Sequence, residues 1–174
     1  EKFIKSRTKL LDWLIIFVDP ISGKAPNLGG NDGASCYGLH NMPFDDYRPS
    51  LQLASMIFYK KRLFNKGPWD EPLHWYEFLN QKSELKALKY NLVNLFEKGG
   101  YVVIKPNMNT RGILRLPIYN FRPAQADPLH FDLWFKGKNL LIDGGSFSYD
   151  IKPEKGGYFS GIEGHNTAQF DNNQ

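Results

Sequence analysis

The sequence predicts an α+β chain in which helices occupy the first half and antiparallel strands the second. Two observations predict this division. Apolar residues before Gly99 recur at helical spacing, whereas after Gly100 they alternate with polar residues at the strand period of two. The 174 residues, 41% of them hydrophobic and 15% aromatic, also suffice to bury a core. One α+β domain and two separate domains both fit the pattern.

The first half contains four expected helices separated by loops. We expect helices at Lys2–Val18, Tyr47–Phe64, Glu71–Asn80 and Ser83–Glu97. The first ends at Asp19-Pro20, because a proline disfavours helix at the residue before it. Pro49 is acceptable in the first turn of the second helix. Residues 22–41 between these helices are rich in Gly, Asn and Asp, and loops of that length often carry function.

The second half contains five expected strands bounded by Gly, Pro and Asn turns. They are Tyr101–Lys105, Gly112–Tyr119, Leu129–Lys136, Asn139–Asp143 and Thr167–Asp171. The order of the strands stays open. Because the chain starts inside an uncapped apolar helix and stops at Gln174 directly after a strand, we expect a fragment of a longer protein.

Composition narrows the classes of partner. The net charge of +4 and the pI of about 9.0 mildly favour anionic partners. Lys60–Arg62 is the sole basic cluster, so we do not expect nucleic-acid binding. The apolar run Leu10–Val18 is too short to span a bilayer, so we expect no membrane partner. Cys36 is the only cysteine, which excludes an internal disulfide and a cysteine-based zinc site.

The stretch QADPLHFDLWFKGKNLLIDGG, residues 125–145, predicts a β-hairpin. If Gly137-Lys138 forms a two-residue type II′ loop, Phe131, Leu133 and Phe135 share an apolar face that packs in the core. A three-residue loop would shift the register by one residue and exchange the faces of one strand.

The opposite face of this hairpin carries an unusual set of charges. In the two-residue register Asp132 lies across from Asp143, and His130 lies nearby. Two carboxylates directly across a sheet repel each other, so such a patch would recruit a cation. The same residues would also suit a solvated outer face that carries no site.

Three segments resemble a known family. They are FRPAQADPLHFDLWFKGKNLLIDGGSFSYD (121–150), YFSGIEGHNTAQFDNNQ (158–174) and, upstream, APNLGGNDGASCYGLHNMPFDDYRPSLQLAS (25–55). Together they resemble the heparinase II/III-like polysaccharide lyases. The resemblance implies an α+β multidomain fragment. Residues 1–97 would be the last part of an incomplete (α/α) toroid and residues 98–174 the start of an antiparallel β-sandwich.

The resemblance also implies a function. These lyases cleave uronic-acid-containing glycans by β-elimination, so an acidic polysaccharide such as a glycosaminoglycan is the expected partner. The alternative is a non-catalytic carbohydrate-binding or structural relative of the same fold. The toroid residues that act on the C5 proton and the leaving oxygen would lie upstream of residue 1, so we expect this fragment to be inactive and prone to self-association. A bacterial periplasmic or envelope location is the family expectation.

Motif matching to the family assigns a divalent metal ion, zinc or calcium, and its ligands. Asp143 in LLIDGG and His165 in GHNT match two ligands, and Gln125 stands where many relatives have the His of an HAD triplet. An amide oxygen suits a harder ion than zinc. Without the resemblance, Asp143 would be an ordinary turn residue and His165 a packed loop histidine.

The remaining expected site residues are assigned to catalysis or to substrate. His130 and Arg122 are the expected catalytic residues, the first because an imidazole can move a proton. The fork of Arg122 matches the geometry of a carboxylate. Gln125, Asp127 and Asn166 are the expected substrate-binding residues.

Overall fold

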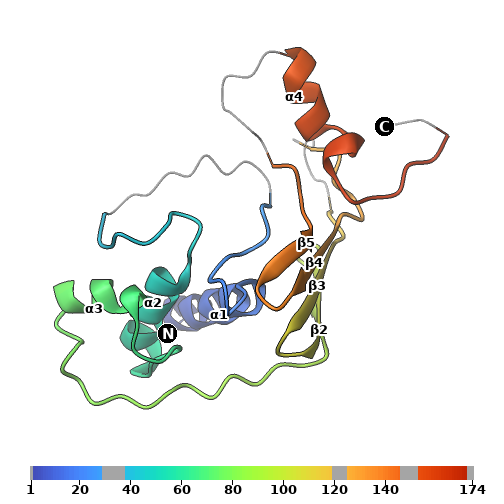
Figure 1. Ribbon diagram of the computed structural model, residues 1–174. Helices are drawn as coiled ribbons and strands as arrows, with labels where there is room; N and C mark the ends of the chain where they lie inside the picture. The colour runs from blue at the N-terminus through green and yellow to red at the C-terminus, as the bar shows by residue number, and fades with distance from the viewer. Residues whose placement is uncertain (1, 29–37, 119–124, 146–152, 172–174) are drawn as a thin grey trace. The chain divides into compact units, whose positions relative to one another are not determined.

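The computed structural model describes residues 2–28, 38–118, 125–145 and 153–171 (Figure 1). The chain divides into two compact units. The first comprises Glu1–Ala25 with Ala34–Lys89, and the second Pro26–Gly33 with Tyr90–Gln174. The first unit holds helices and the second a five-stranded antiparallel sheet, which confirms the α+β prediction. The domain boundary between residues 97 and 98 stays a prediction.

The first unit is built on α1 (Lys2–Phe17), α2 (Arg48–Tyr59), the 3-10 turn η1 (Pro68–Asp70) and α3 (Glu71–Trp75). As expected, α1 ends just before Asp19, whose carboxylate accepts the backbone N–H groups of Ile21 at 3.0 Å and Ser22 at 2.8 Å. Pro49 lies in the first turn of α2, and Lys60 ends that helix with a left-handed φ of 55°. No described helix is long and apolar enough to cross a bilayer.

Two predicted helices end early and a third is wrong. The helix expected at Tyr47–Phe64 stops at Tyr59, and the one expected at Glu71–Asn80 is the five-residue α3. Ser83–Glu97 is not helical, and its last part is strand β1 (Val93–Phe96). Pairing with the following strand decides this, because cross-strand packing overrides a weak helical preference.

The sheet of the second unit is a meander in the order β1-β2-β3-β4-β5. The further strands are β2 (Tyr101–Asn107), β3 (Thr110–Arg115), β4 (Phe131–Phe135) and β5 (Lys138–Leu141). The strand expected at Thr167–Asp171 is not among them. That segment follows α4 (Pro153–Ser160) and the 3-10 turn η2 (Ile162–Gly164) instead.

The turn between β4 and β5 lies one residue earlier than predicted. Phe135 pairs with Lys138, so the loop is Lys136-Gly137. Both loop residues have positive φ, 48° and 79°, which is the type I′ geometry rather than the expected type II′. A register shift follows, because Trp134 pairs with Asn139 but Leu133 pairs with Leu141. This β-bulge gives β5 one extra residue.

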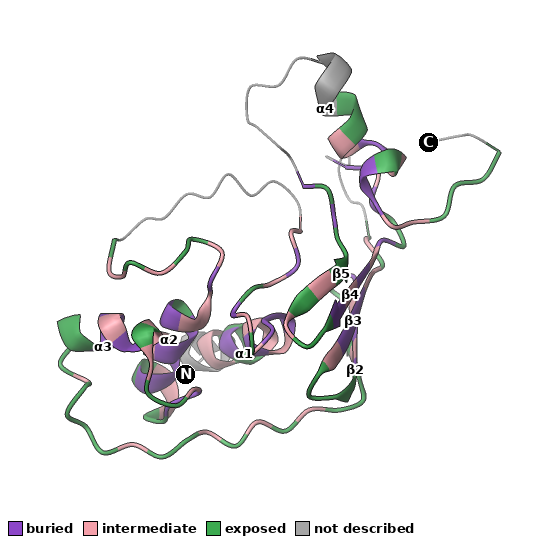
Figure 2. Cartoon of the chain, viewed as in Figure 1, coloured by how far each residue is buried: buried purple, intermediate pink, exposed green. Residues whose placement is uncertain are grey.

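The buried face of β4 is the opposite of the predicted one. Asp132 is 0% exposed and Trp134 3%, whereas Phe135, expected in the core, is 45% exposed. Figure 2 shows buried residues within the strands of the sheet. Register places Asp132 beside Ile113 of β3, and Ile113 beside Val103 of β2, both buried. The charged side chains of the hairpin therefore lie on the covered face of the sheet, so the solvated-face interpretation is wrong.

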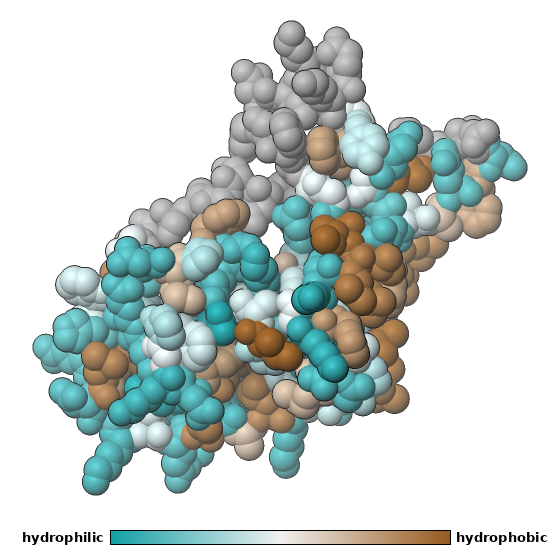
Figure 3. Space-filling model, in the orientation of Figure 1, coloured by the Kyte–Doolittle hydropathy of each residue, from teal (hydrophilic) through white to brown (hydrophobic). Residues whose placement is uncertain are grey.

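The other face of the sheet is apolar and partly open. Its members include Val93 and Leu95 of β1, and Leu141 of β5, all exposed. Brown surface follows the strands in Figure 3. An apolar sheet face of this kind is normally covered by another layer of structure.

Candidate functional site

Three segments of the second unit converge on the covered face of the sheet. His130 immediately precedes β4, Asp143 follows β5, and His165 follows η2. Main-chain hydrogen bonds hold the segments together. The N–H of Gly144 donates to the carbonyl of Gly164 at 2.8 Å, and that of Phe131 to the carbonyl of Asn166 at 3.0 Å. The backbone itself therefore fixes the positions of the three side chains.

The two imidazoles lie on either side of the Asp143 carboxylate. Asp143 Oδ2 is 3.2 Å from His165 Nδ1 and 3.8 Å from His130 Nε2. The rings of His130 and His165 are 5.5 Å apart between centroids and nearly perpendicular, at 82°. Each of the three residues offers one ligand atom, and these atoms all lie within 4.8 Å of one another. A buried set of this composition can hold a metal ion.

Several polar atoms of this cluster, and of Asp132 beside it, are buried without a hydrogen-bond partner among the described residues. They are Nε2 of His130, Nε2 of His165 and both carboxylate oxygens of Asp132. Buried polar atoms are nearly always satisfied, so a group of unsatisfied ones indicates a missing ligand. The donor chemistry fits a divalent cation, because imidazole nitrogens and carboxylate oxygens are ordinary ligands of such ions.

Hydrogen bonds orient two of the side chains. The N–H of Gly145 donates to Asp143 Oδ1 at 2.7 Å, which leaves Oδ2 for the histidines. Gly145 has a φ of 68°, and a Cβ there would lie 2.1 Å from Asn27 Nδ2, so only glycine suits this turn. The N–H of Asn166 donates to His130 Nδ1 at 3.1 Å. A neutral His130 ring therefore carries its proton on Nε2.

Asn166, an expected substrate-binding residue, contacts the segment that carries Asp143. Its side-chain amide donates to the carbonyl of Ile142 at 3.1 Å. Together with its two main-chain bonds, this contact ties the segments of His130, Asp143 and His165 to one another. A substrate contact of Asn166 stays a prediction.

The other expected residues have different surroundings. Gln125 is buried, and its role as a metal ligand stays a prediction. Asp127, 1% exposed, lies 2.8 Å from Nε of Arg115 on β3. Arg122 lies outside the described residues.

Arg115 links Asp127 to a tyrosine near the cluster. Its Nη1 donates to the hydroxyl of Tyr101 at 3.0 Å. Burial raises the pKa of Tyr101 above its usual value, and the positive charge of Arg115 offsets part of that effect. Arg115 and Tyr101 were not predicted from the sequence. Arg115 at the end of β3 pairs with Tyr101 at the start of β2. Their proximity could not be predicted before the register of the two strands was known.

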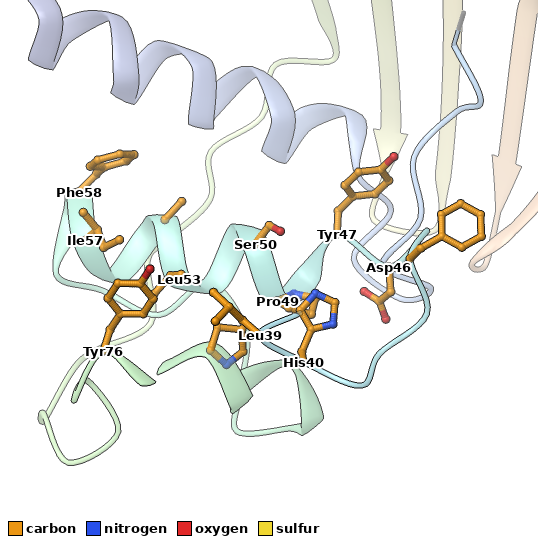
Figure 4. A pocket seen from close by; sticks show the side chains of 13 residues that line it. Leu39, His40, Asp46, Tyr47, Pro49, Ser50, Leu53, Ile57, Phe58 and Tyr76 are labelled. Atoms are coloured by element: carbon orange, nitrogen blue, oxygen red, sulfur yellow. The ribbon is translucent and has the colours of Figure 1, made fainter. Parts of the chain in front are cut away.

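A separate cavity of about 440 Å³ lies in the first unit (Figure 4). Leu53, Ile57 and Phe58 of α2 form much of its wall, with Tyr76 opposite. Its lining is mainly apolar. Asp46, at one end, is already ion-paired with Arg48 at 2.5 Å. This cavity therefore suits an apolar group and offers no chemistry comparable to the buried cluster of the second unit.

Comparisons with known proteins found a family match, a relative and similar solved structures. A family described as "Heparinase II/III-like, C-terminal" matches residues 91–174. A heparin-sulfate lyase of Bacteroides stercoris is 29% identical over 116 residues, which cover 63% of this chain and 17% of that protein. The chain thus spans about a sixth of the relative that it matches.

Solved structures show the same relationship at the level of the fold. A heparinase III gene product with methylated lysines has a TM-score of 0.61 at 20% identity, over 93% of this chain and 23% of that one. The heparan sulfate lyase HepC from Pedobacter heparinus has a TM-score of 0.50 at 16% identity, over 85% of this chain and 21% of that one. At these identities the likeness shows the fold alone.

Proposed function

We propose that the protein is a polysaccharide lyase acting on acidic glycans, because its residues 91–174 match the heparinase II/III-like family. The reaction is β-elimination at a uronic acid, and a sulfated glycosaminoglycan is the substrate class. The relative and the solved structures named above, all heparin- or heparan-type lyases, support this choice of substrate. A periplasmic or envelope location belongs to the same proposal.

One observation carries the proposal beyond the family relationship. Three side chains from separate segments, His130, Asp143 and His165, converge where the strands meet the following loops, all buried and with unsatisfied ring nitrogens. Such an arrangement costs stability unless it binds something. Residues that reduce stability in this way are typical of functional sites.

The metal ligands in this proposal are Asp143 and His165, with Gln125 as the third ligand that the motif predicts. His130 lies beside them, with Nε2 at 3.8 Å from Asp143 Oδ2. A bound divalent cation would supply positive charge that neutralises the carboxylate of a uronic acid. The residues themselves do the positioning. Asp143 orients the ring of His165 through Nδ1, and the Asn166 N–H fixes the ring of His130.

We include the β-sandwich and the toroid in the proposal. The apolar sheet face supports a second covering sheet, because Val93 is 52% exposed and Leu95 57%. The helices α1 and α2 of the first unit would be part of the toroid. These layers would be supplied by the rest of a longer protein.

The test is an assay for unsaturated uronate by its ultraviolet absorbance, with a panel of acidic glycans as substrates. We expect absorbance to grow with the wild-type protein of full length and to be lost in His165→Ala together with bound metal. His74→Ala is the matched control, because His74 is an exposed histidine of the first unit. Wild-type protein that yields no product on any acidic glycan would refute the lyase proposal.

A non-catalytic carbohydrate-binding relative is the second candidate. It is favoured by Gln125, which stands where many relatives have a histidine. This candidate predicts retention of acidic glycans without any absorbance change. Glycan binding by the wild type that yields no product would select it over the lyase.

A further inference from the structure

We propose that Asp132 is a ligand of the same divalent cation as Asp143 and His165, so that the centre contains two carboxylates. This inference rests on the metal centre of the proposed function. Neither the family comparison nor the sequence motifs assign a role to this residue.

Asp132 is a buried carboxylate with no hydrogen bond. Its side chain is 0% exposed, and neither oxygen has a hydrogen-bond partner among the described residues. The facing residue of β3 is Ile113, which is apolar. His130 Nε2 lies 3.5 Å from Oδ2 of Asp132. That distance is beyond a normal hydrogen bond.

Such a group is expensive to bury. A carboxylate transferred out of water without a charged or hydrogen-bonded partner costs several kcal/mol, by order of magnitude. A positive charge beside Asp132 would offset this cost. A divalent cation provides a positive charge beside Asp132. The same cation also balances the charge of Asp143, which lies against the same imidazole ring of His130.

The other buried carboxylates of the second unit have partners of their own. Asp127 pairs with Arg115 at 2.8 Å, and Asp143 accepts the Gly145 N–H on Oδ1. Asp132 alone among these three has both oxygens uncommitted. Oδ2 of Asp132 lies 3.5 Å from His130 Nε2, the same nitrogen that Asp143 Oδ2 approaches at 3.8 Å.

His130 gives a second reason to add Asp132 to the ligand set. Because its Nδ1 accepts the Asn166 N–H, the neutral ring has a proton on Nε2, the nitrogen that faces the two carboxylates. An Nε2–H group is a hydrogen-bond donor and offers no lone pair to a cation. Asp132 offers oxygen lone pairs at the same place.

The inferred donor set also selects the cation. Two carboxylates with imidazole suit an ion that accepts both oxygen and nitrogen, such as zinc or manganese. Calcium takes six to eight oxygen ligands, which this cluster does not offer. The charge of the two carboxylates matches a single divalent ion.

The experiment titrates zinc, manganese and calcium separately into chelator-treated protein by calorimetry, and records the melting temperature of each metal-free and metal-loaded form. The variant is Asp132→Asn, which keeps the shape and removes the charge. Asp70→Asn is the matched control, since Asp70 is a buried carboxylate paired with Arg62 in the first unit. His165→Ala tests whether the cation binds at this centre, because it removes another proposed ligand.

We expect Asp132→Asn to weaken binding of zinc or manganese by at least about 10-fold, the smallest effect of losing even an indirect contact to a metal. Its metal-free form should melt at or above the metal-free wild type, because an uncompensated charge has been removed. A merely structural aspartate would lower both melting temperatures equally. Asp70→Asn should lower stability but keep the wild-type affinity.

Wild-type affinity in Asp132→Asn, with binding lost in His165→Ala, would overturn the assignment of Asp132 while leaving the metal centre intact. Equal destabilisation of the metal-free and loaded forms, or no binding of any of the three cations to the wild type, would also overturn it. Metal binding that depends on Asp132 in a protein without lyase activity would support this inference and refute only the proposed function.

Discussion

Replacing Arg115 with methionine is expected to destabilise the second unit far more than replacing its partner Asp127 with asparagine. The two side chains form an ion pair at 2.8 Å but differ in burial, at 20% and 2% exposed. Without Arg115 the carboxylate stays buried beside a neutral chain. Without the charge of Asp127, the guanidinium still reaches water and still donates to Tyr101.

The burial of each partner decides how much stability each substitution costs. Removing one partner of a buried pair costs about 3–5 kcal/mol. Arg115→Met should fall near the lower value, about 3 kcal/mol, because Arg115 is itself 20% exposed and the pair is not fully buried. Asp127→Asn should cost about 1 kcal/mol, since the amide oxygen still accepts a hydrogen bond. For a chain of this size the larger loss lowers the melting temperature by about 6–12 °C.

Urea unfolding of the two single variants and the double variant measures this difference. The double variant should be more stable than Arg115→Met, because the stranded charge has been removed along with its partner. Equal losses in the two single variants, or a double variant less stable than both, would refute the argument from burial.

Three further predictions concern the metal centre and the backbone. Chelation should lower the melting temperature of the wild type and leave His165→Ala unchanged in differential scanning fluorimetry, since a cation at 100 times its Kd adds about 2.7 kcal/mol of stability. Asn166→Ala should cost about 1 kcal/mol in urea unfolding through the lost bond to the Ile142 carbonyl, and an unchanged midpoint would argue against that bond. Gly100→Ala should cost about 1–3 kcal/mol of stability, because φ at Gly100 is 68° and the new Cβ would lie 2.4 Å from a backbone oxygen. Gly157→Ala should instead stabilise α4 by up to about 1 kcal/mol, because the space around that position is open. Comparable melting temperatures for the two variants would contradict this prediction.

The expected site could be found only in part from the sequence. Motif matching proposed Asp143 and His165, which the structure brings within 3.2 Å of each other. It also proposed Gln125 as a ligand, and that assignment stays a prediction. The structure adds His130, which motif matching did not assign to the metal. The position of this ring depends on how β4 begins, so the motif alone could not place it.

The sequence by itself determined that helices come first and antiparallel strands second, although β1 lies where a helix was expected. Helical spacing before Gly99 and alternation after Gly100 follow from local geometry, so they can be read without a fold. The tertiary structure alone decided which face of β4 is buried. Alternation places Asp132 and Trp134 together but is silent on which face is covered, and the bulge opposite Leu133 shifts the register. Burial of the charged face, and with it the candidate metal centre, is therefore a property of packing and not of pattern.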